Sequence, residues 1–232
     1  MSETHSSTGP YPALRLDERL RDTGLFLSQA LRTFKATGSV VPSSAALARA
    51  MAEHVRERPI PGQPLRILEA GAGTGAITRG LADAMIPGDT ADLVESNAEF
   101  AGHLSELLTT DPDLARISDR ATVHAKLVGE MGTDRTYDVI ASGLPFANFD
   151  AEDVEEILEY YFRILEPGGY LSFYGYLYTK GVKAVIARRE DYLRQARTSW
   201  VVQDWIDRYG IRSERVFANV PPAFVHHLRK PA

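Results

Sequence analysis

Three glycines at alternate positions, Gly71, Gly73 and Gly75, form the stretch of this chain best suited to hold a ligand. Glycine lets the backbone turn sharply and approach a bound molecule without an intervening Cβ atom. Glu95 follows Gly75 by 20 residues, a spacing at which a carboxylate can accept hydrogen bonds from ribose hydroxyls. The pattern therefore predicts a ligand that contains ribose. Because GAGTGA also fits the dinucleotide fingerprint G-x-G-x-x-A, the motif alone leaves NAD open.

A second group of candidate residues is aromatic and basic. Tyr174, Tyr176 and Tyr178 alternate at the period of a strand, so their rings can share one face. Aromatic faces attract methylated ammonium groups by about 0.5–2 kcal/mol. The basic side chains that follow, and that could pair with a phosphate, are Lys180, Lys183, Arg188 and Arg189. Packing roles for the tyrosines and a solvated helix face for the basic residues remain open alternatives.

These residues lie within a regular alternation of expected strands and helices. Such an alternation predicts a mostly parallel sheet with helices on both faces, and ligands at the carboxyl ends of its strands. A long helix over 182–209 and a closing antiparallel hairpin, 214–220 with 223–228, complete the pattern. The expected strands are 65–70, 91–95, 121–125, 137–142 and 170–174, and the expected helices between them are 77–85, 98–108 and 153–165.

Length and composition suit one α/β domain with an N-terminal extension. The chain has 232 residues, 44% hydrophobic and 25% charged. We expect a flexible tail over 1–12, a helical extension over 13–62, which includes helices at 13–35 and 45–58, and a single domain over 63–232. The absence of cysteine excludes disulfides and thiolate metal ligands, and no metal site is expected. The sequence shows neither a secretory leader nor a run of about 18 apolar residues.

Charge is unevenly distributed along the chain. Residues 180–230 carry 11 Lys and Arg against five acids, or +6, so with a net charge of −5 the residues 1–179 carry −11. The overall negative charge argues against a general nucleic-acid binder, because affinity for phosphate backbones comes from clustered cations. The basic part could face an anionic surface, or it could be an ordinary solvated face.

Two motifs resemble those of the class I S-adenosylmethionine-dependent methyltransferases. Glu69 stands two residues before the glycine loop, like the acid of their motif I, and YDVIASGLPF is similar to their motif IV. The resemblance implies a Rossmann-like α/β fold with a mostly parallel seven-stranded sheet and a C-terminal antiparallel hairpin. It also implies that S-adenosylmethionine is the cofactor. The residues implied to hold it are Glu69, Gly71, Ala72, Gly73, Thr74, Gly75, Glu95, Ser96 and Ser142.

Within that superfamily, three segments look like the bacterial soluble-type phospholipid N-methyltransferases: TGSVVPSSAALARAM, SGLPFANF and NVPPAFVHHLR. The resemblance implies stepwise methylation of phosphatidylethanolamine toward phosphatidylcholine by a cytoplasmic, peripherally membrane-associated enzyme. Its methyltransferase domain would be 63–232, and an anionic membrane surface would contact the N-terminal helix and the basic C-terminal part. The implied catalytic residues are Gly143, Leu144, Pro145, Phe146 and Tyr176, and the implied substrate-binding residues are Phe149, Tyr174, Tyr178, Lys180, Arg188 and Arg189.

Other activities remain open at this stage. The ribosomal RNA adenine dimethyltransferases share a similar glycine loop, but Gly143 stands where the adenine N-methyltransferases have Asn or Asp to accept a nucleobase amine. A methyltransferase of a small soluble metabolite, and a module that binds the cofactor without transferring methyl, are further alternatives. Many relatives have an acid after the third strand to contact adenine, whereas this chain has His124-Ala125-Lys126. No role in the site is assigned to His124, and the N-terminal helix could be a membrane anchor, a lid or both.

Overall fold

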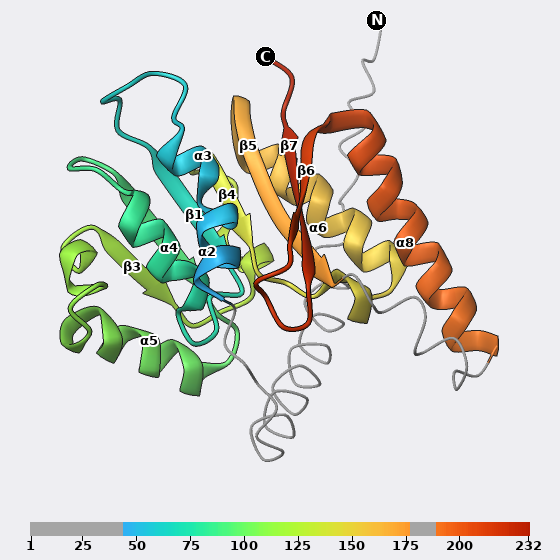
Figure 1. The fold of residues 1–232 in the computed structure, drawn as a ribbon, viewed down its shortest axis with the longest axis horizontal. Helices are drawn as coiled ribbons and strands as arrows, with labels where there is room; N and C mark the ends of the chain where they lie inside the picture. Colours follow the sequence, from blue (N-terminus) through green and yellow to red (C-terminus); the bar gives the residue numbers. More distant parts are fainter. Residues whose placement is uncertain (1–43, 177–188) are drawn as a thin grey trace, which may run out of the picture.

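The computed structural model describes residues 44–176 and 189–232 as one layered α/β unit (Figure 1). The expected tail over 1–12 and the helix over 13–35 lie outside the described residues. The described strands are β1 Arg66–Ala70, β2 Thr90–Val94, β3 Ala121–His124, β4 Tyr137–Ser142, β5 Leu165–Tyr176, β6 Gly210–Val216 and β7 Ala223–Arg229. The described α-helices are α2 Ala45–Met51, α3 Glu53–Arg56, α4 Ala76–Ala84, α5 Ala98–Thr110, α6 Ala151–Ile164 and α8 Arg189–Tyr209, and the short 3-10 helices are η1 Ala115–Ile117, η2 Val128–Met131 and η3 Phe146–Asn148.

The seven strands form one sheet in the order β3-β2-β1-β4-β5-β7-β6. Strands β1 to β5 pair in parallel, and β7 pairs antiparallel with both β5 and β6. The order reverses between β1 and β4, which are neighbours in the sheet but not in the sequence. This confirms the expected mostly parallel sheet with a closing hairpin. It also places a topological switch point, where α/β folds bind ligands, at the carboxyl ends of β1 and β4.

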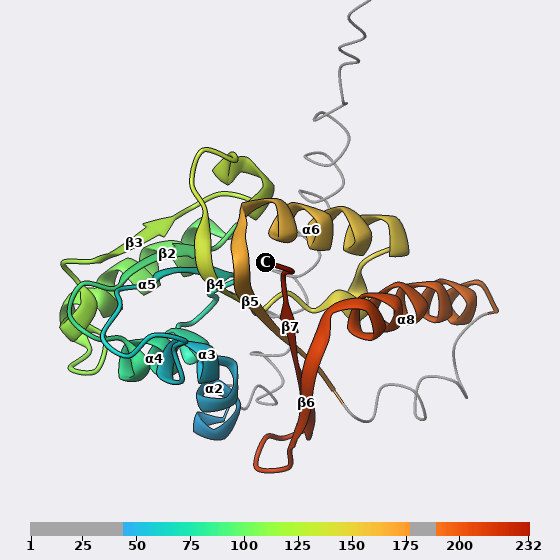
Figure 2. The same cartoon turned by 90° about the horizontal axis from the view of Figure 1, so that it is seen from above.

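Helices cover both faces of the sheet, as Figure 2 shows from above. One apolar cluster lies under α2, α4 and α5 and includes Leu47, Leu81 and Leu104. The other lies under α6 and α8 and includes Tyr161 and Trp205. Because each face is covered, four of the five residues of β1 and of β2 are buried, which include the acids Glu69 and Asp92. None of the helices in the described ranges is long and apolar enough to cross a bilayer.

Capping, close packing and local backbone geometry shape the helices. The N-terminal turn of α5 is capped by the Asn97 side chain, which accepts hydrogen bonds from two backbone N–H groups of that turn. Helix α2 packs so closely on α4 that a Cβ atom at Gly80 would lie 2.4 Å from the Ala48 carbonyl oxygen. The expected helix over 45–58 is two pieces, because Ala52 leaves helical geometry with φ −93° and ψ 8°.

Two expected strand boundaries were wrong. β5 runs from Leu165 to Tyr176, well beyond the expected 170–174, because Leu165 pairs with Tyr137 of β4 and β7 pairs with β5 as far as Tyr176. The expected strand over 214–220 instead begins at Gly210 and ends at Val216, and residues 217–222 form the turn that leads into β7. In Figure 1 this turn projects from the lower edge of the sheet.

Candidate active site

The glycine loop after β1 is fixed by backbone hydrogen bonds at the switch point. The N–H groups of Gly71 and Ala72 donate to the Val94 carbonyl at 2.8 and 3.1 Å, which ties the loop to the end of β2. Gly71, Gly73 and Gly75 have φ of +74°, +55° and +80°, a region that favours glycine. Among the residues that the structure describes, a Cβ atom at Gly73 would meet nothing closer than 4.0 Å, so the backbone of this residue faces open space there. The loop can therefore accept a ligand directly against its main chain.

Glu95 braces this loop from the end of β2. Its Oε2 accepts a hydrogen bond from the Gly73 N–H at 2.9 Å, and its Oε1 accepts one from the Asn97 N–H at 2.8 Å. The carboxylate is therefore held in one orientation beside the open face of Gly73, and each oxygen retains lone-pair capacity for a further donor. Ser96 follows it and is exposed. The predicted pairing of Glu95 with ribose hydroxyls agrees with this geometry and stays a prediction.

Glu69 is fully buried at the end of β1, beneath the loop. The Thr78 hydroxyl, in the first turns of α4, donates to its Oε2 at 2.7 Å. Its Oε1 has no hydrogen-bond partner among the described residues. Burial raises the pKa of this carboxyl from 4.5 to about 8. The site thus contains a buried acid whose pKa is raised and one of whose oxygens is unpaired among the described residues.

The loop after β4 packs directly on the glycine loop. The Gly143 N–H donates to the Ala70 carbonyl at 2.7 Å, and a Cβ atom on Gly143 would lie 2.7 Å from the Gly71 carbonyl oxygen. A side chain at position 143 would therefore displace the backbone of the glycine loop. Leu144 lies against Gly71 from the same segment. The structure thus explains the glycine at 143 by close approach of two backbones.

Ser142, predicted to contact the cofactor, is fully buried at the end of β4. Its hydroxyl lies 3.1 Å from the Tyr161 hydroxyl of α6. Burial raises the pKa of Tyr161 well above its ordinary value, so this phenol stays neutral. The pair fixes the end of β4 from below, which is a positioning role that the sequence did not reveal.

Phe146 and Phe149, predicted to line the path of the methyl group and the substrate, are each 4% exposed. The Phe146 ring packs edge-on against Phe173 with centroids 5.3 Å apart. Both phenylalanines belong to the apolar cluster under α6 and α8. Gly143, Leu144 and Pro145 are half-buried and form the more accessible part of the segment. Contact of the two rings with a substrate therefore stays a prediction and is less supported than contact of residues 143–145.

Tyr174 and Tyr176 lie together at the end of β5, beyond the last pair of β4 with β5, which joins Ser142 and Phe173. Their rings meet edge to face, with centroids 5.6 Å apart, which agrees with the expected shared face. Tyr176 is 39% exposed, so its ring can meet a ligand at this edge. Tyr178, Lys180 and Arg188 lie outside the described residues. Arg189 is the first residue of α8, and its side chain also lies outside the described part.

His124, the last residue of β3, contacts an acidic side chain of the neighbouring strand. The ring of His124 lies 2.7 Å from Asp92 through Nε2, and the Tyr137 hydroxyl donates to the other oxygen of Asp92 at 2.9 Å. Arg135 also pairs with Asp92 at 3.3 Å. These contacts link side chains of β2, β3 and β4. Leaving His124 out of the predicted site agrees with these contacts.

A second polar cluster lies on the sheet beside α3. His227 is fully buried and its Nε2 lies 3.6 and 3.5 Å from carboxylate oxygens of Glu53 and Glu214, an arrangement that could hold a metal ion. The Arg212 guanidinium pairs with the other oxygens of both carboxylates. Because Arg212 pairs with both carboxylates and offsets one of their two negative charges, we assign the cluster to the packing of α3 on β6 and β7.

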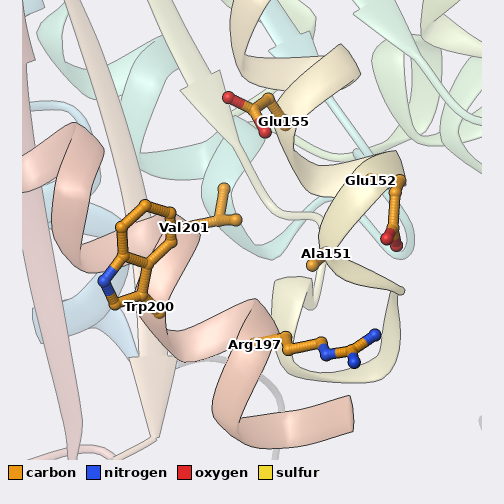
Figure 3. Close-up of a pocket in the computed structure, with 6 residues that line it drawn as sticks. All are labelled: Ala151, Glu152, Glu155, Arg197, Trp200 and Val201. Atoms are coloured by element: carbon orange, nitrogen blue, oxygen red, sulfur yellow. The ribbon is translucent and has the colours of Figure 1, made fainter.

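A shallow pocket of about 250 Å³ lies between α6 and α8 (Figure 3). Glu152 and Glu155 of α6 line it together with Arg197 and Trp200 of α8. None of the residues predicted to bind the cofactor lies in its wall. The candidate site at the switch point is instead formed by the loops after β1 and β4, together with Glu69 and Glu95.

The chain is similar in sequence to a lipid-modifying enzyme. It is 28% identical over 213 residues to the ornithine lipid N-methyltransferase of Singulisphaera acidiphila, an alignment that spans 90% of this chain and 97% of that protein. No family model matches the chain. The sequence comparison thus supports a resemblance to lipid N-methyltransferases.

Solved structures share the fold at low sequence identity. The O-methyltransferase TomG of Streptomyces achromogenes, solved with S-adenosylmethionine, superimposes with a TM-score of 0.62 at 16% identity, covering 88% of this chain and 89% of that one. The O-methyltransferase of Bacillus cereus, solved with S-adenosylhomocysteine, gives 0.62 at 16% identity over 88% and 90%. These neighbours confirm the class I methyltransferase fold. Together with the sequence relative, they support the predicted class of S-adenosylmethionine-dependent methyltransferases.

Proposed function

We propose that this chain uses S-adenosylmethionine to methylate the primary amine of a membrane lipid. The observation that carries the proposal is the joint placement of Glu69, Gly73 and Glu95 at the switch point, directly against the Gly143 segment. The first three would hold the cofactor, and the half-buried Gly143-Leu144-Pro145 segment beside them would offer its backbone groups to an acceptor. The similarity to an ornithine lipid N-methyltransferase supports a lipid as that acceptor.

The cofactor fits the residues present at this edge. Gly73 offers an open backbone face, Glu95 a fixed carboxylate for ribose hydroxyls, and Glu69 a buried oxygen without a partner. A cationic amino acid end placed near Glu69 would favour its ionised form and offset the cost of its burial. When bound, the cofactor supplies an electrophilic methyl group on a sulfonium.

Methyl transfer to an amine requires that the amine be oriented and shielded from water, and it requires little acid-base catalysis. The lone pair of a neutral amine forms the new C–N bond while the C–S bond breaks with its electrons on sulfur, and the resulting ammonium loses a proton to water. Backbone carbonyls of the Gly143-Leu144-Pro145 segment can orient the amine hydrogens. The rings of Tyr174 and Tyr176 can hold the partly methylated, cationic amine for a further round.

Two lipid acceptors compete. The motifs of the chain resemble enzymes that act on phosphatidylethanolamine, which makes this lipid the first candidate and phosphatidylcholine its final product. The sequence relative favours ornithine lipid as the second. Both carry a primary amine, so the chemistry at Gly143 would be the same. Nucleic acid is disfavoured as an acceptor, because Gly143 has no side chain that could accept a nucleobase amine.

Access to a lipid places the enzyme at the cytoplasmic face of a membrane in this proposal. Binding there would be peripheral and electrostatic, through the N-terminal helix and the basic C-terminal part, so salt should release the protein from anionic vesicles. Deletion of residues 1–36 should weaken this binding.

The deciding experiment incubates the full chain with labelled S-adenosylmethionine and, separately, phosphatidylethanolamine vesicles, ornithine lipid vesicles, ribosomal RNA and soluble amines. Label in a lipid product supports the proposal, and label only in RNA or soluble amines overturns it.

A further inference from the structure

The turn between β6 and β7 presents two large apolar side chains to solvent. Residues 217–222 read FANVPP, and Phe217 and Val220 are 66% and 65% exposed. Asn219, between them, is only 3% exposed. Phe217 and Val220 thus place exposed apolar side chains on one projecting turn, where they are available for an interaction.

The turn lies at the same edge of the sheet as the candidate active site. Ala223, which follows it, pairs with Tyr176 at the end of β5, and β5 runs parallel to β4. The carboxyl ends of β1, β4 and β5 therefore share the edge from which the turn projects (Figure 1). A surface that engaged the turn would face the glycine loop and the tyrosine pair together.

Specific hydrogen bonds hold the turn in shape. Asn219 Oδ1 accepts from the Ser44 N–H at 2.9 Å, and Asn219 Nδ2 donates to the Pro221 carbonyl at 2.8 Å. Pro221 and Pro222 each restrict φ. Because the turn is fixed before it meets a partner, little conformational entropy remains to be lost when its side chains are buried. The exposure of Phe217 and Val220 is thus a built feature of the hairpin.

Positive charge lies directly behind the apolar tip. Arg215 precedes Val216 at the end of β6, is exposed, and holds its guanidinium 5.4 Å from the centroid of the Phe224 ring. An apolar tip with a cation behind it matches the layering of a lipid surface, in which acyl chains lie beneath anionic headgroups.

We propose that the β6–β7 turn inserts Phe217 and Val220 into the surface of an anionic bilayer and thereby holds the catalytic edge against the membrane. The inference rests on the proposed function for its reason, since only a lipid acceptor requires the site to face a bilayer. It is tested by binding, so it can fail while the activity stands. Contact of this turn with a second copy of the chain is the competing outcome.

The first experiment uses the absence of cysteine from the chain. Phe217→Cys, labelled with an environment-sensitive dye, is mixed with vesicles of phosphatidylethanolamine and phosphatidylglycerol. Matched controls are Ile60→Cys and Ile211→Cys, because these residues are 59% and 51% exposed but lie before β1 and at the start of β6, toward the opposite edge. A blue shift at 217 that lipid-borne quenchers abolish, without one at 60 or 211, supports insertion. No shift at 217, or a shift without vesicles that grows with protein concentration, overturns it.

The second experiment measures binding and activity of the full chain. Phe217→Ser with Val220→Ser should lower partition into these vesicles by about tenfold, because the apolar side chains no longer leave water. Ile60→Ser with Ile211→Ser should leave it unchanged. Methylation of a short-chain, monomeric acceptor lipid should be equal in the wild type and the tip variant, while methylation of vesicle lipid should fall. Unchanged partition overturns the inference. Absence of lipid methylation by the wild type, with partition still dependent on the tip, overturns only the proposed function.

Discussion

The two sides of the catalytic edge are built in different ways. On the cofactor side, the glycine loop, Glu95 and Gly143 are locked by short backbone hydrogen bonds, and added atoms at Gly71 or Gly143 would collide with neighbouring groups. On the acceptor side, Tyr176 and the turn with Phe217 and Val220 are exposed. The proposed cofactor side therefore tolerates little change, whereas the proposed acceptor side is more open to substitution. Such a division is expected where one fold serves different methyl acceptors.

The largest effect is expected from Gly73→Val. The branched side chain would occupy the open space against which the ligand must lie, and Gly73 also has φ +55°. Affinity for S-adenosylmethionine should fall by about 100-fold or more, which titration calorimetry measures. Gly62→Val is the matched control, since Gly62 has φ +79° with nothing within 4 Å but precedes β1. If both variants fold and bind equally, the cofactor does not lie on this loop.

A smaller loss is expected from Glu95→Ala. The change removes an acceptor from the Gly73 and Asn97 N–H groups and from the ribose. Hydrogen bonds to a charged group contribute about 1.5–3 kcal/mol, so affinity should fall by about 10–100-fold. Glu95→Gln keeps one oxygen and should lose less, and Glu106→Ala on the exposed face of α5 should lose nothing. An affinity of Glu95→Ala equal to that of the wild type would remove Glu95 from the site.

Much of the cofactor side could be predicted because it is local in sequence. The loop, its helix and Glu95 come from one βαβ unit, so spacing alone brings them together. Thr78 and Tyr161 were missed because their partners, Glu69 and Ser142, are set by how α4 and α6 pack on the sheet, which spacing along the chain does not show. A polar side chain on the inner face of a predicted helix was the available signal in both cases.

The acceptor side could be predicted less well, because long-range pairing sets it. The last three residues of β5, 174–176, pair with β7 alone, and the alternation of the tyrosines did not show that the strand continues to Tyr176. Residues 217–220 look like the end of a strand, but Asn219 bonds to Ser44, 175 positions away, and turns the chain. Strand propensity is overridden here by a tertiary contact.

The affinity for the cofactor should depend on pH through Glu69, the buried acid beneath the glycine loop. Because folding raises the pKa of Glu69 from 4.5 to about 8, the folded chain retains a proton that the unfolded chain has lost, and its contribution to stability declines as pH rises through that range. Cofactor binding that favours the ionised form should release this proton near pH 7. Apparent affinity should then rise by up to about tenfold per pH unit below pH 8.

Glu69→Gln is the comparison that isolates this proton. The amino group of the ligand titrates in the same range, so its contribution appears in both proteins and cancels in the difference. Calorimetry in buffers of different ionisation enthalpy should show fewer protons released by the variant than by the wild type. Equal proton release in both proteins would mean that Glu69 keeps its proton when the cofactor binds.

The smallest effect is expected on the acceptor side, at Tyr176. If its ring and that of Tyr174 hold a methylated ammonium, Tyr176→Phe keeps the aromatic face and should change the first methylation only modestly. Tyr176→Ala removes the exposed face, with a loss of about 0.5–2 kcal/mol in binding of the cationic monomethyl and dimethyl intermediates. Those intermediates should then accumulate relative to the trimethyl product, as mass analysis of lipid products after a timed reaction would reveal. Affinity for the cofactor should stay unchanged in both variants, and a fall in that affinity would mean that Tyr176 also contributes to cofactor binding. An unchanged product ratio in Tyr176→Ala would mean that the tyrosine has a packing role only.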